Sequence, residues 1–268
     1  MPGVWDPLSA LLAGQAGFRT VFLSGFALAG TLLGQPDIGI IGQAEVADAA
    51  RRVCAAVPDV AVVVDADTGY GDSSAVARTV ELWEQAGAAG IFLEDQEWPK
   101  KCGHMDDKSV VDREEWLAKL RTALRTRTDL HVTARTDSRA VISLDEAIER
   151  GRMARDLGVD AVFVEAPQSI GEMERIAEGI TGVTLVANMV EKGKTPLLTP
   201  AELHDLGFDL IVSPLSGLLS AARALGDAYS TLLAHGTMRG HLDSMMTFDG
   251  FTYLVGLQKH LPDGATDR

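Results

Sequence analysis

Eight short apolar segments recur along the chain at fairly regular intervals, and they constrain the fold more than any other feature of the sequence. Each segment is rich in Val, Ile, Leu or Phe and has the length of one β-strand. Unbroken apolar runs are typical of parallel strands that are covered on both faces, because a strand with one face in water alternates polar and apolar residues. The segments lie at residues 1–4, 20–24, 60–65, 90–94, 130–135, 160–165, 183–188 and 209–213.

Amphipathic stretches between these segments begin and end with helix signals. Asp6 precedes Pro7, and Ser143, Ser169 and Thr199 each have a glutamate three residues later. A proline in the first turn and a Ser or Thr paired with Glu are both typical of helix starts. Glycines that relieve a left-handed helix end follow several stretches, at Gly17, Gly87, Gly158 and Gly207. Helices are therefore expected to alternate with the strands.

Eight strands that alternate with helices predict a single (β/α)8 barrel of the TIM type. The competing architecture, an open doubly wound sheet, usually carries a GxGxxG phosphate loop after its first strand, and the GYG at 69–71 does not match it. No linker or change of composition marks a domain boundary. We expect the barrel to span residues 1–235 and a helical extension to span 236–268, with the apolar segment 248–257 packed on another subunit.

The charge of the chain excludes two classes of partner. With 38 acidic and 24 basic side chains, the formal net charge is -14, which repels a nucleic acid backbone or an anionic membrane. The sequence shows no secretory leader at its start and no apolar run of about 18 residues that would span a bilayer. An anionic substrate needs a local positive centre, either basic side chains or a bound cation. The two cysteines, Cys54 and Cys102, lack zinc-ligand spacing and fit a reducing cytoplasm.

Polar side chains close most of the expected strands. In a (β/α)8 barrel the chemistry takes place at the carboxyl ends of the strands. Each polar residue alone is better explained as an ordinary strand-end or helix-capping residue. Three acids at one barrel mouth repel each other, however, so Asp65, Asp67 and Glu94 predict an oxygen-rich site for Mg2+, with Mn2+ as the alternative. The strand ends carry Ser24, Asp65, Asp67, Glu94, Asp95, Arg135, Glu165, Asn188 and Ser213.

The segment from residue 94 to residue 111 is a polar connection with unusual chemistry. It contains Lys100, Lys101, Cys102, Gly103 and His104 in succession. A cysteine directly after two lysines and close to a histidine is expected to favour the thiolate and to take part in proton transfer. Cys54 lies in a helical stretch among valines, where a structural role is the better explanation.

Five motifs together resemble the isocitrate lyase and phosphoenolpyruvate mutase superfamily. They occur in order along nearly the whole chain, at the expected strand ends. Within that superfamily, the chain is most similar to the 2,3-dimethylmalate and oxaloacetate-cleaving lyases of the petal death protein type, through SGF, LGQPDIG, WPKKCGHM, FVEAP and ANMVEKGKTPL. The five motifs are DADTGYG at 65–71, LEDQ at 93–96, KKCGH at 100–104, ARTD at 134–137 and ANMVEKGKTPL at 187–197.

The resemblance implies a metal site and a carboxylate site. In that family the acids that match Asp65 and Asp67 hold Mg2+, partly through water, and those that match Asp37 and Glu94 surround it. The carboxylate of a 2-oxo acid is implied to bind at Ser24, Gly25 and Phe26.

The resemblance also implies the catalytic loop and the binding site of the second product. Lys100, Cys102, Gly103 and His104 belong to a loop that closes over the site, and Cys102 is implied to be the general acid. The carboxylate of the second product is implied to lie among His104, Arg135, Glu165 and Asn188. Family members assemble as tetramers that exchange their last helix, so a homotetramer is expected.

The implied reaction is cleavage of the C2–C3 bond of a 2-hydroxy dicarboxylate, with Mg2+ stabilising the oxyanion as a Lewis acid. Removal of the hydroxyl proton is assigned either to a metal-bound water or to Glu165. Methylisocitrate lyases have a glycine at Phe26, a threonine at Val190 and an arginine at Leu219. The departures at these three positions remove groups that would bind a third carboxylate, which favours an alkylated malate or oxaloacetate over a tricarboxylate.

Two other functions are alternatives. Carboxyphosphonoenolpyruvate mutase shares the KxCGH loop, so a phosphonate-forming enzyme stays open, whereas ordinary phosphoenolpyruvate mutases lack the cysteine that stands here at Cys102. A barrel without catalytic activity would show gaps among the acids or in the loop. The sequence shows none.

Overall fold

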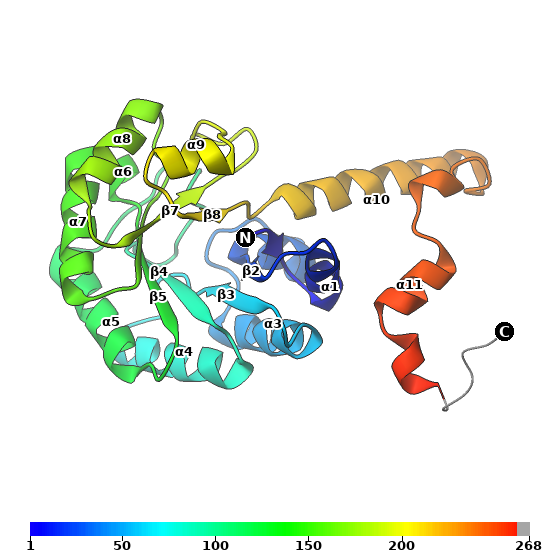
Figure 1. The fold of residues 1–268 in the computed structure, drawn as a ribbon, viewed down its shortest axis with the longest axis horizontal. Coiled ribbons are helices and arrows are strands. Elements are labelled where there is room, and N and C mark those ends of the chain that lie inside the picture. The colour runs from blue at the N-terminus through cyan, green and yellow to red at the C-terminus, as the bar shows by residue number, and fades with distance from the viewer. Residues whose placement is uncertain (262–268) are drawn as a thin grey trace.

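The computed structural model describes residues 1–261, and its core is a barrel of eight parallel strands (Figure 1). Each strand pairs with the next one along the chain, and a parallel bridge from Pro2 to Ser213 joins the first strand to the last. The eight apolar segments are thus confirmed as strands. Their bounds are β1 Gly3–Val4, β2 Thr20–Leu23, β3 Ala61–Asp65, β4 Gly90–Glu94, β5 His131–Thr136, β6 Ala161–Val164, β7 Thr184–Asn188 and β8 Leu210–Val212.

Helices follow the strands and cover the barrel from outside (Figure 1). The predicted helix starts are confirmed, because Asp6, Ser143, Ser169 and Thr199 cap their helices with side-chain hydrogen bonds. The helices are α1 Pro7–Gln15, α2 Gly25–Leu28, α3 Gln43–Ala56, α4 Ser73–Ala86, α5 Arg113–Thr126, α6 Ser138–Val141, α7 Leu144–Leu157, α8 Ile170–Gly179, α9 Pro200–Asp205, α10 Ser216–His235 and α11 Phe248–Leu254, with a π-helical turn at Ala29–Leu33 and 3-10 turns at Leu242–Ser244 and Leu257–His260.

Aromatic side chains fill the interior of the barrel and form the floor of its upper end. The rings of Phe22 and Phe92 lie 4.9 Å apart, and those of Phe92 and Phe163 lie 5.7 Å apart. The guanidinium of Arg135 stacks on Phe163 at 5.4 Å from the ring centre. A packed interior of this kind leaves no channel through the barrel. Chemistry can therefore take place only at the end of the barrel where the carboxyl ends of the strands meet.

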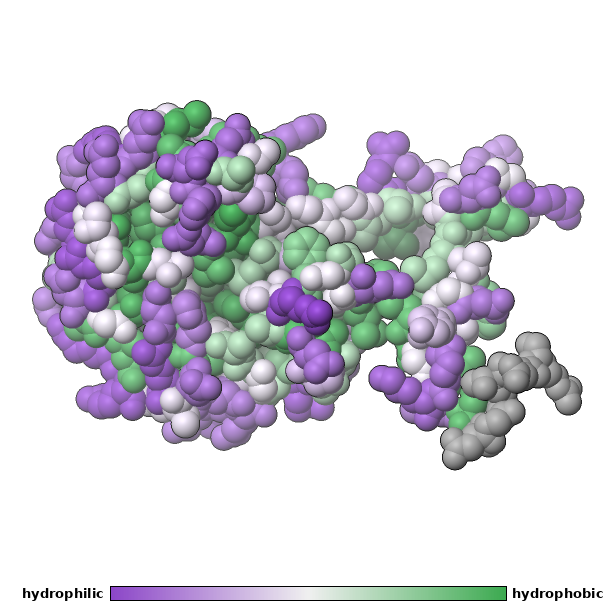
Figure 2. All heavy atoms as spheres, viewed as in Figure 1, coloured by the Kyte–Doolittle hydropathy of each residue, from purple (hydrophilic) through white to green (hydrophobic). Residues whose placement is uncertain are grey.

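The C-terminal arm, residues 216–261, extends away from the barrel (Figure 1). None of the residues of α10 is buried, and Leu233 and Phe248 are 91% and 82% exposed. Figure 2 shows apolar surface on this arm and on the barrel face beside it. The extra helix expected beyond the eighth repeat is present as α11, and the expected division at residue 235 stays a prediction, although α10 already leaves the barrel at Ser216.

The described part of the chain contains no helix that is both long enough and apolar enough to cross a membrane. The end of the predicted extension, residues 262–268, lies outside the described residues.

Candidate active site

The predicted site residues meet at the carboxyl ends of the strands, around a cavity of about 50 Å3. Gly25, Asp67, Glu94 and Lys100 lie behind its wall, next to residues that line it. The predicted residues that line the cavity are Ser24, Phe26, Asp37, Asp65, Cys102, Gly103, His104, Arg135, Glu165 and Asn188.

Lys100 lies between two of the predicted metal-site acids. Its ammonium is 2.6 Å from Asp37 Oδ1 and 2.7 Å from Asp67 Oδ1, and all three side chains are buried. Burial by itself lowers the pKa of Lys100, but the carboxylates of Asp67 and Asp37 raise it well above its ordinary value, so the amine stays charged. The loop after β4 is therefore fastened to the acid cluster through Lys100.

Two carboxylates of this cluster are left without enough donors. Asp67 Oδ2 and Glu94 Oε1 are buried and accept no hydrogen bond. Burial raises the pKa of Asp67 to about 7, against the opposing charge of Lys100, and it raises the pKa of Glu94 well above the usual range. Buried oxygens without donors fit a hard divalent cation, which prefers carboxylate ligands.

The acids do not converge as a ready-made set of direct ligands. Among residues 1–261, no group of three or more His, Cys, Asp or Glu side chains is placed to hold one ion directly. This geometry suits Mg2+, which keeps several of its waters and uses one or two carboxylates in most sites. Asp65 and Asp67, which a left-handed turn with a φ of 46° at Asp67 places side by side, are the residues best placed for such contacts.

The start of α2 forms a second wall of the site. Ser24 caps this helix, because its hydroxyl accepts a hydrogen bond from the Ala27 amide at 3.3 Å. A Cβ atom on Gly25 would lie 3.0 Å from Asp65 Oδ2, so a larger residue would crowd the acid cluster. The amides of the first turn of a helix have no intrahelical acceptor and can receive an anion.

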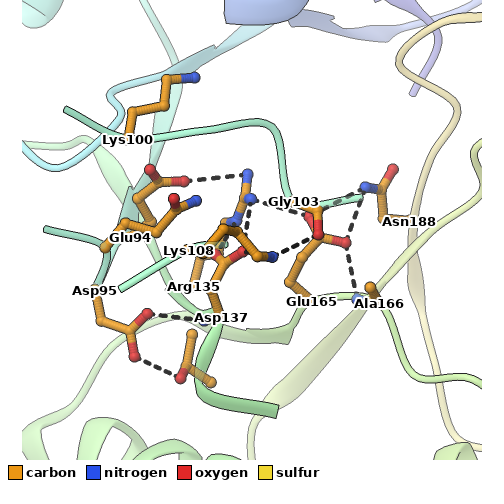
Figure 3. A network of polar contacts seen from close by, with 12 residues as sticks. Glu94, Asp95, Lys100, Gly103, Lys108, Arg135, Asp137, Glu165, Ala166 and Asn188 are labelled. Carbon is orange, nitrogen blue, oxygen red and sulfur yellow. Dashed lines mark hydrogen bonds and ion pairs between the residues drawn. The ribbon is translucent and has the colours of Figure 1, made fainter. Parts of the chain in front are cut away.

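Arg135 joins the carboxylates of three neighbouring strand ends, as Figure 3 shows. Its guanidinium lies 3.3 Å from Glu94, 2.9 Å from Asp137 and 3.1 Å from Glu165. Burial by itself lowers the pKa of Arg135, but these carboxylates raise it well above the usual value. The arginine is thus held charged at the bottom of the cavity.

Glu165 receives donors from several directions. Asn188 Nδ2 donates to both of its oxygens at 3.3 Å, and the Ala166 amide donates at 2.8 Å. A φ of 53° at Ala166 turns the chain back so that this amide reaches the carboxylate. His104 Nε2 lies 3.4 Å from Glu165 Oε1, and burial lowers the pKa of His104 despite that neighbour. Because its oxygens are already occupied, Glu165 is poorly suited to remove a proton.

Cys102 faces the cavity as a thiol, which corrects the expectation of a thiolate. Burial raises the pKa of Cys102 to about 11. The charge that was expected to activate it is elsewhere, because Lys100 pairs with Asp37 and Asp67, and Lys101 donates to the Asp107 carbonyl at 2.7 Å. A protonated thiol is suited to donate a proton rather than to attack.

The protonated state of Cys102 predicts a pH profile. We expect the rate of its alkylation by iodoacetamide to rise about tenfold per pH unit from pH 7.5 to pH 9.5, because the thiolate fraction follows the raised pKa. Peptide mapping separates it from Cys54, whose pKa burial also raises to about 11. A plateau of the Cys102 rate below pH 9 would contradict the structure.

Glycines let the loop after β4 lie against its neighbours. A Cβ atom on Gly103 would lie 2.4 Å from Glu165 Oε2, and one on Gly193 would lie 2.7 Å from His104 Nδ1. The Lys194 amide donates to His104 Nδ1 at 3.0 Å, which places the ring proton on Nε2. The loop after β4 and the loop after β7 are therefore locked together over the cavity.

Several buried polar residues of the site were not predicted. Asp137 follows Arg135 in the ARTD motif, and Lys108 follows the KKCGH motif, but neither spacing reveals that they pair at 2.6 Å. Arg150, on α7, reaches Asp95 Oδ2 at 3.0 Å from the outer side of the barrel. These residues are far apart in sequence, so only the fold brings them together.

The chain matches the family model described as phosphoenolpyruvate phosphomutase over residues 1–233. A carboxyvinyl-carboxyphosphonate phosphorylmutase from Arabidopsis thaliana is 47% identical, over 96% of this chain and 77% of its own length. The petal death protein of Dianthus caryophyllus is 44% identical, over 96% of this chain and 81% of its own. The 2,3-dimethylmalate lyase of Eubacterium barkeri is 42% identical, over 96% and 89%.

Solved structures agree with these relatives. Oxaloacetate acetylhydrolase, in complex with the inhibitor 3,3-difluorooxalacetate, superposes with a TM-score of 0.92 at 35% identity, covering 97% of this chain and 88% of its own. Phosphonopyruvate hydrolase, in complex with oxalate and Mg2+, superposes with a TM-score of 0.86 at 26% identity, covering 97% and 90%. This chain belongs to the phosphoenolpyruvate mutase and isocitrate lyase superfamily, whose members are lyases, mutases and hydrolases of this barrel fold.

Proposed function

We propose that this protein is a Mg2+-dependent carbon–carbon lyase. Its substrate would be a 2-hydroxy dicarboxylate such as an alkylated malate, or oxaloacetate as its hydrate, and its products a 2-oxo acid or oxalate and a carboxylic acid. The observation that carries the proposal is the protonated Cys102 thiol in the same cavity as Arg135 and Asn188. A cleavage that forms a carbanion needs a proton donor beside the side chains that bind the substrate carboxylate.

Each residue can be given a task in that reaction. The hydroxyl at C2 loses its proton, the C2–C3 bond breaks to leave a carbonyl at C2, and the electron pair stays on C3. Cys102 protonates C3 as general acid and regains its proton from water. Lys100 and His104 hold the loop that carries Cys102, through Asp37, Asp67 and the Lys194 amide. Because Glu165 already accepts several hydrogen bonds, the hydroxyl proton is better assigned to a water near the acid cluster.

The binding roles follow from two parts of the site, the start of α2 and the pair of Arg135 and Asn188. The first turn of α2, at Ser24, Gly25 and Phe26, would receive the carboxylate next to C2, and Arg135 with Asn188 would hold the carboxylate next to C3. Gly103 gives the loop room to cover them. Asp65, Asp67, Glu94 and Asp37 would hold the cation, with Mn2+ as an alternative to Mg2+. When bound, the cation supplies positive charge that stabilises the oxyanion at C2.

The apolar part of the cavity supports a dicarboxylate rather than a tricarboxylate. Phe26, Val190 and Leu215 line the cavity with apolar side chains that offer no donor for a third carboxylate. Leu219, on α10, is 46% exposed and likewise offers none. A substrate that places an alkyl group or a hydrogen against these apolar residues therefore fits best.

A panel of 2-hydroxy dicarboxylates and oxaloacetate, assayed with Mg2+, tests the proposal. We expect release of a 2-oxo acid or oxalate that EDTA abolishes and added Mg2+ restores. A phosphonate-forming or phosphonate-cleaving enzyme is the second candidate, supported by the 47% identity to the phosphorylmutase relative. Turnover of a phosphonate substrate without any 2-hydroxy dicarboxylate would replace the lyase by the mutase. No turnover in either assay would favour a barrel without catalysis.

The C-terminal arm supports a homotetramer in which subunits exchange their last helices. A groove of about 370 Å3 lies between α1 and the start of α10, and Leu8 and Leu12 of α1 and Phe18 after it are partly exposed there. An exposed apolar arm beside an exposed apolar groove is unstable in water unless a second copy covers both.

The location in the cytoplasm stays a prediction.

Light scattering on a sizing column tests this assembly. We expect a mass of four chains for the native protein and a smaller mass for the double variant Leu233→Ser, Phe248→Ser, because those side chains are the most exposed apolar groups of the arm. An equivalent double substitution of exposed polar residues, Arg51→Ser with Asp129→Ser, serves as control. A native protein that elutes as a monomer would refute the tetramer.

A further inference from the structure

Lys108 is a buried cation of the catalytic loop. Its side chain is 1% exposed, and its ammonium lies 2.6 Å from Asp137 Oδ1 and 2.5 Å from the carbonyl oxygen of Gly103. Figure 3 shows Lys108 between these two groups. Burying a lysine is costly unless its charge is paired, so a buried ammonium with two short contacts is a specific arrangement rather than an incidental one.

The carboxylate that Lys108 contacts also orients Arg135. Asp137 is fully buried and accepts hydrogen bonds from Arg135 Nε at 2.9 Å and from Nη2 at 3.3 Å. Burial by itself raises the pKa of Asp137, but Arg135 and Lys108 together lower it to about 2. The Asp137 amide donates to Asp95 Oδ1 at 2.8 Å, which fixes its main chain. One carboxylate thus holds a cation of the loop and the arginine of the site.

The other contact of Lys108 acts on the loop next to the thiol. Gly103, whose carbonyl oxygen accepts the hydrogen bond from Lys108, directly follows Cys102 in the chain. Gly103 also lies against Glu165. Glu165 is in turn 3.1 Å from Arg135. The ammonium of Lys108 therefore connects the main chain at the thiol to the guanidinium in the cavity through two separate routes.

We propose that Lys108 is a positioning residue that couples the placement of Cys102 to the orientation of Arg135. When Lys108 lies between Gly103 and Asp137, it holds the loop over the cavity. It also keeps the guanidinium of Arg135 oriented toward the cavity. Without it, the loop loses one fastening and Asp137 loses one of its two cations. The catalytic consequence rests on the proposed function, whereas the effect on the loop does not.

The substitution Lys108→Met removes the ammonium and keeps the length of the side chain, and Lys101→Met is the matched control. Lys101 lies in the same loop, and its ammonium donates only to the exposed Asp107 carbonyl. We expect alkylation of Cys102 by iodoacetamide at pH 8 to become about ten- to a hundredfold faster in Lys108→Met, as expected for the loss of a charge-assisted hydrogen bond. Removal of a nearby positive charge raises a thiol pKa and slows alkylation, so a faster reaction reports loop opening.

The kinetic readout is separate. We expect kcat for the 2-hydroxy dicarboxylate to fall about tenfold or more in Lys108→Met and to stay unchanged in Lys101→Met. If the native enzyme turns over no substrate of the panel, the proposed function fails while the alkylation result still decides the coupling of the loop. An alkylation rate equal to the native rate in folded Lys108→Met overturns the inference. Should that variant not fold, Lys108→Gln decides, since its side chain stays polar but lacks the charge and the length to join both oxygens, and a native alkylation rate there would likewise overturn the inference.

Discussion

Replacing Cys102 by alanine is expected to lower kcat about 10²- to 10⁴-fold, which is the usual contribution of a positioned general acid. The thiol lines the cavity, and burial raises its pKa to about 11, so it carries a proton at every pH at which the enzyme is expected to work. KM should change little, because the proposed carboxylate contacts of Arg135 and Asn188 remain. Steady-state kinetics with the best substrate of the panel measure both values.

Two controls separate a lost proton donor from a damaged fold. Cys54→Ala removes the other cysteine, which is half-buried in α3 away from the cavity, and should leave kcat within about twofold. Cys102→Ser keeps the size of the side chain but holds its proton too tightly to release it, and should remain nearly as slow as Cys102→Ala. A Cys102→Ala enzyme within tenfold of the native kcat would remove Cys102 from the role of general acid.

The strands and their order were predictable because their residues obey one strong constraint. A strand that is covered on both faces must be apolar throughout, and segments such as 60–64 and 161–164 satisfy this without tertiary information. The helix starts at Ser143 and Thr199 were predictable for a similar reason, since capping is a local interaction over three residues.

The direction of the last long helix was not predictable from such local patterns. The residues of α10 predict a helix, yet its apolar side chains match a barrel-covering helix as well as one that projects outward. The choice depends on which surface covers those side chains, and a single chain does not specify that surface.

The chemistry of the catalytic loop was predicted only in part. The strand-end rule brought Asp65, Glu94, Arg135 and Glu165 to one end of the barrel, because the carboxyl ends of parallel strands meet there. The state of Cys102 was not predictable from its neighbours in sequence. Lys100 turns toward Asp67, so sequence adjacency overstated the positive charge at the thiol and missed the effect of burial.

Replacing Arg135 by methionine is expected to destabilise the protein by about 3–5 kcal/mol at neutral pH, because it leaves buried carboxylates without their cation. Arg135 contacts Glu94, Asp137 and Glu165, and each of these is at most 2% exposed. Thermal unfolding should show a midpoint lowered by roughly 10 °C. Arg51→Met, which removes an exposed arginine paired with Asp48, should shift it by less than about 2 °C.

The loss in Arg135→Met should depend on pH in a defined direction. In the native protein the pKa of Asp137 is lowered to about 2, so its contribution to stability is complete above the unfolded value of about 4 and is lost as the pH falls toward 2. Without Arg135, Asp137 loses the larger of the two charges that lower its pKa while burial still raises it, so the variant gains less stability than the native protein as the pH rises above about 4. The difference between the two proteins should therefore grow from pH 4 to pH 7. A difference that stays constant over that range would mean that the arginine acts mainly through its packing on Phe163, 5.4 Å away, rather than through its charge.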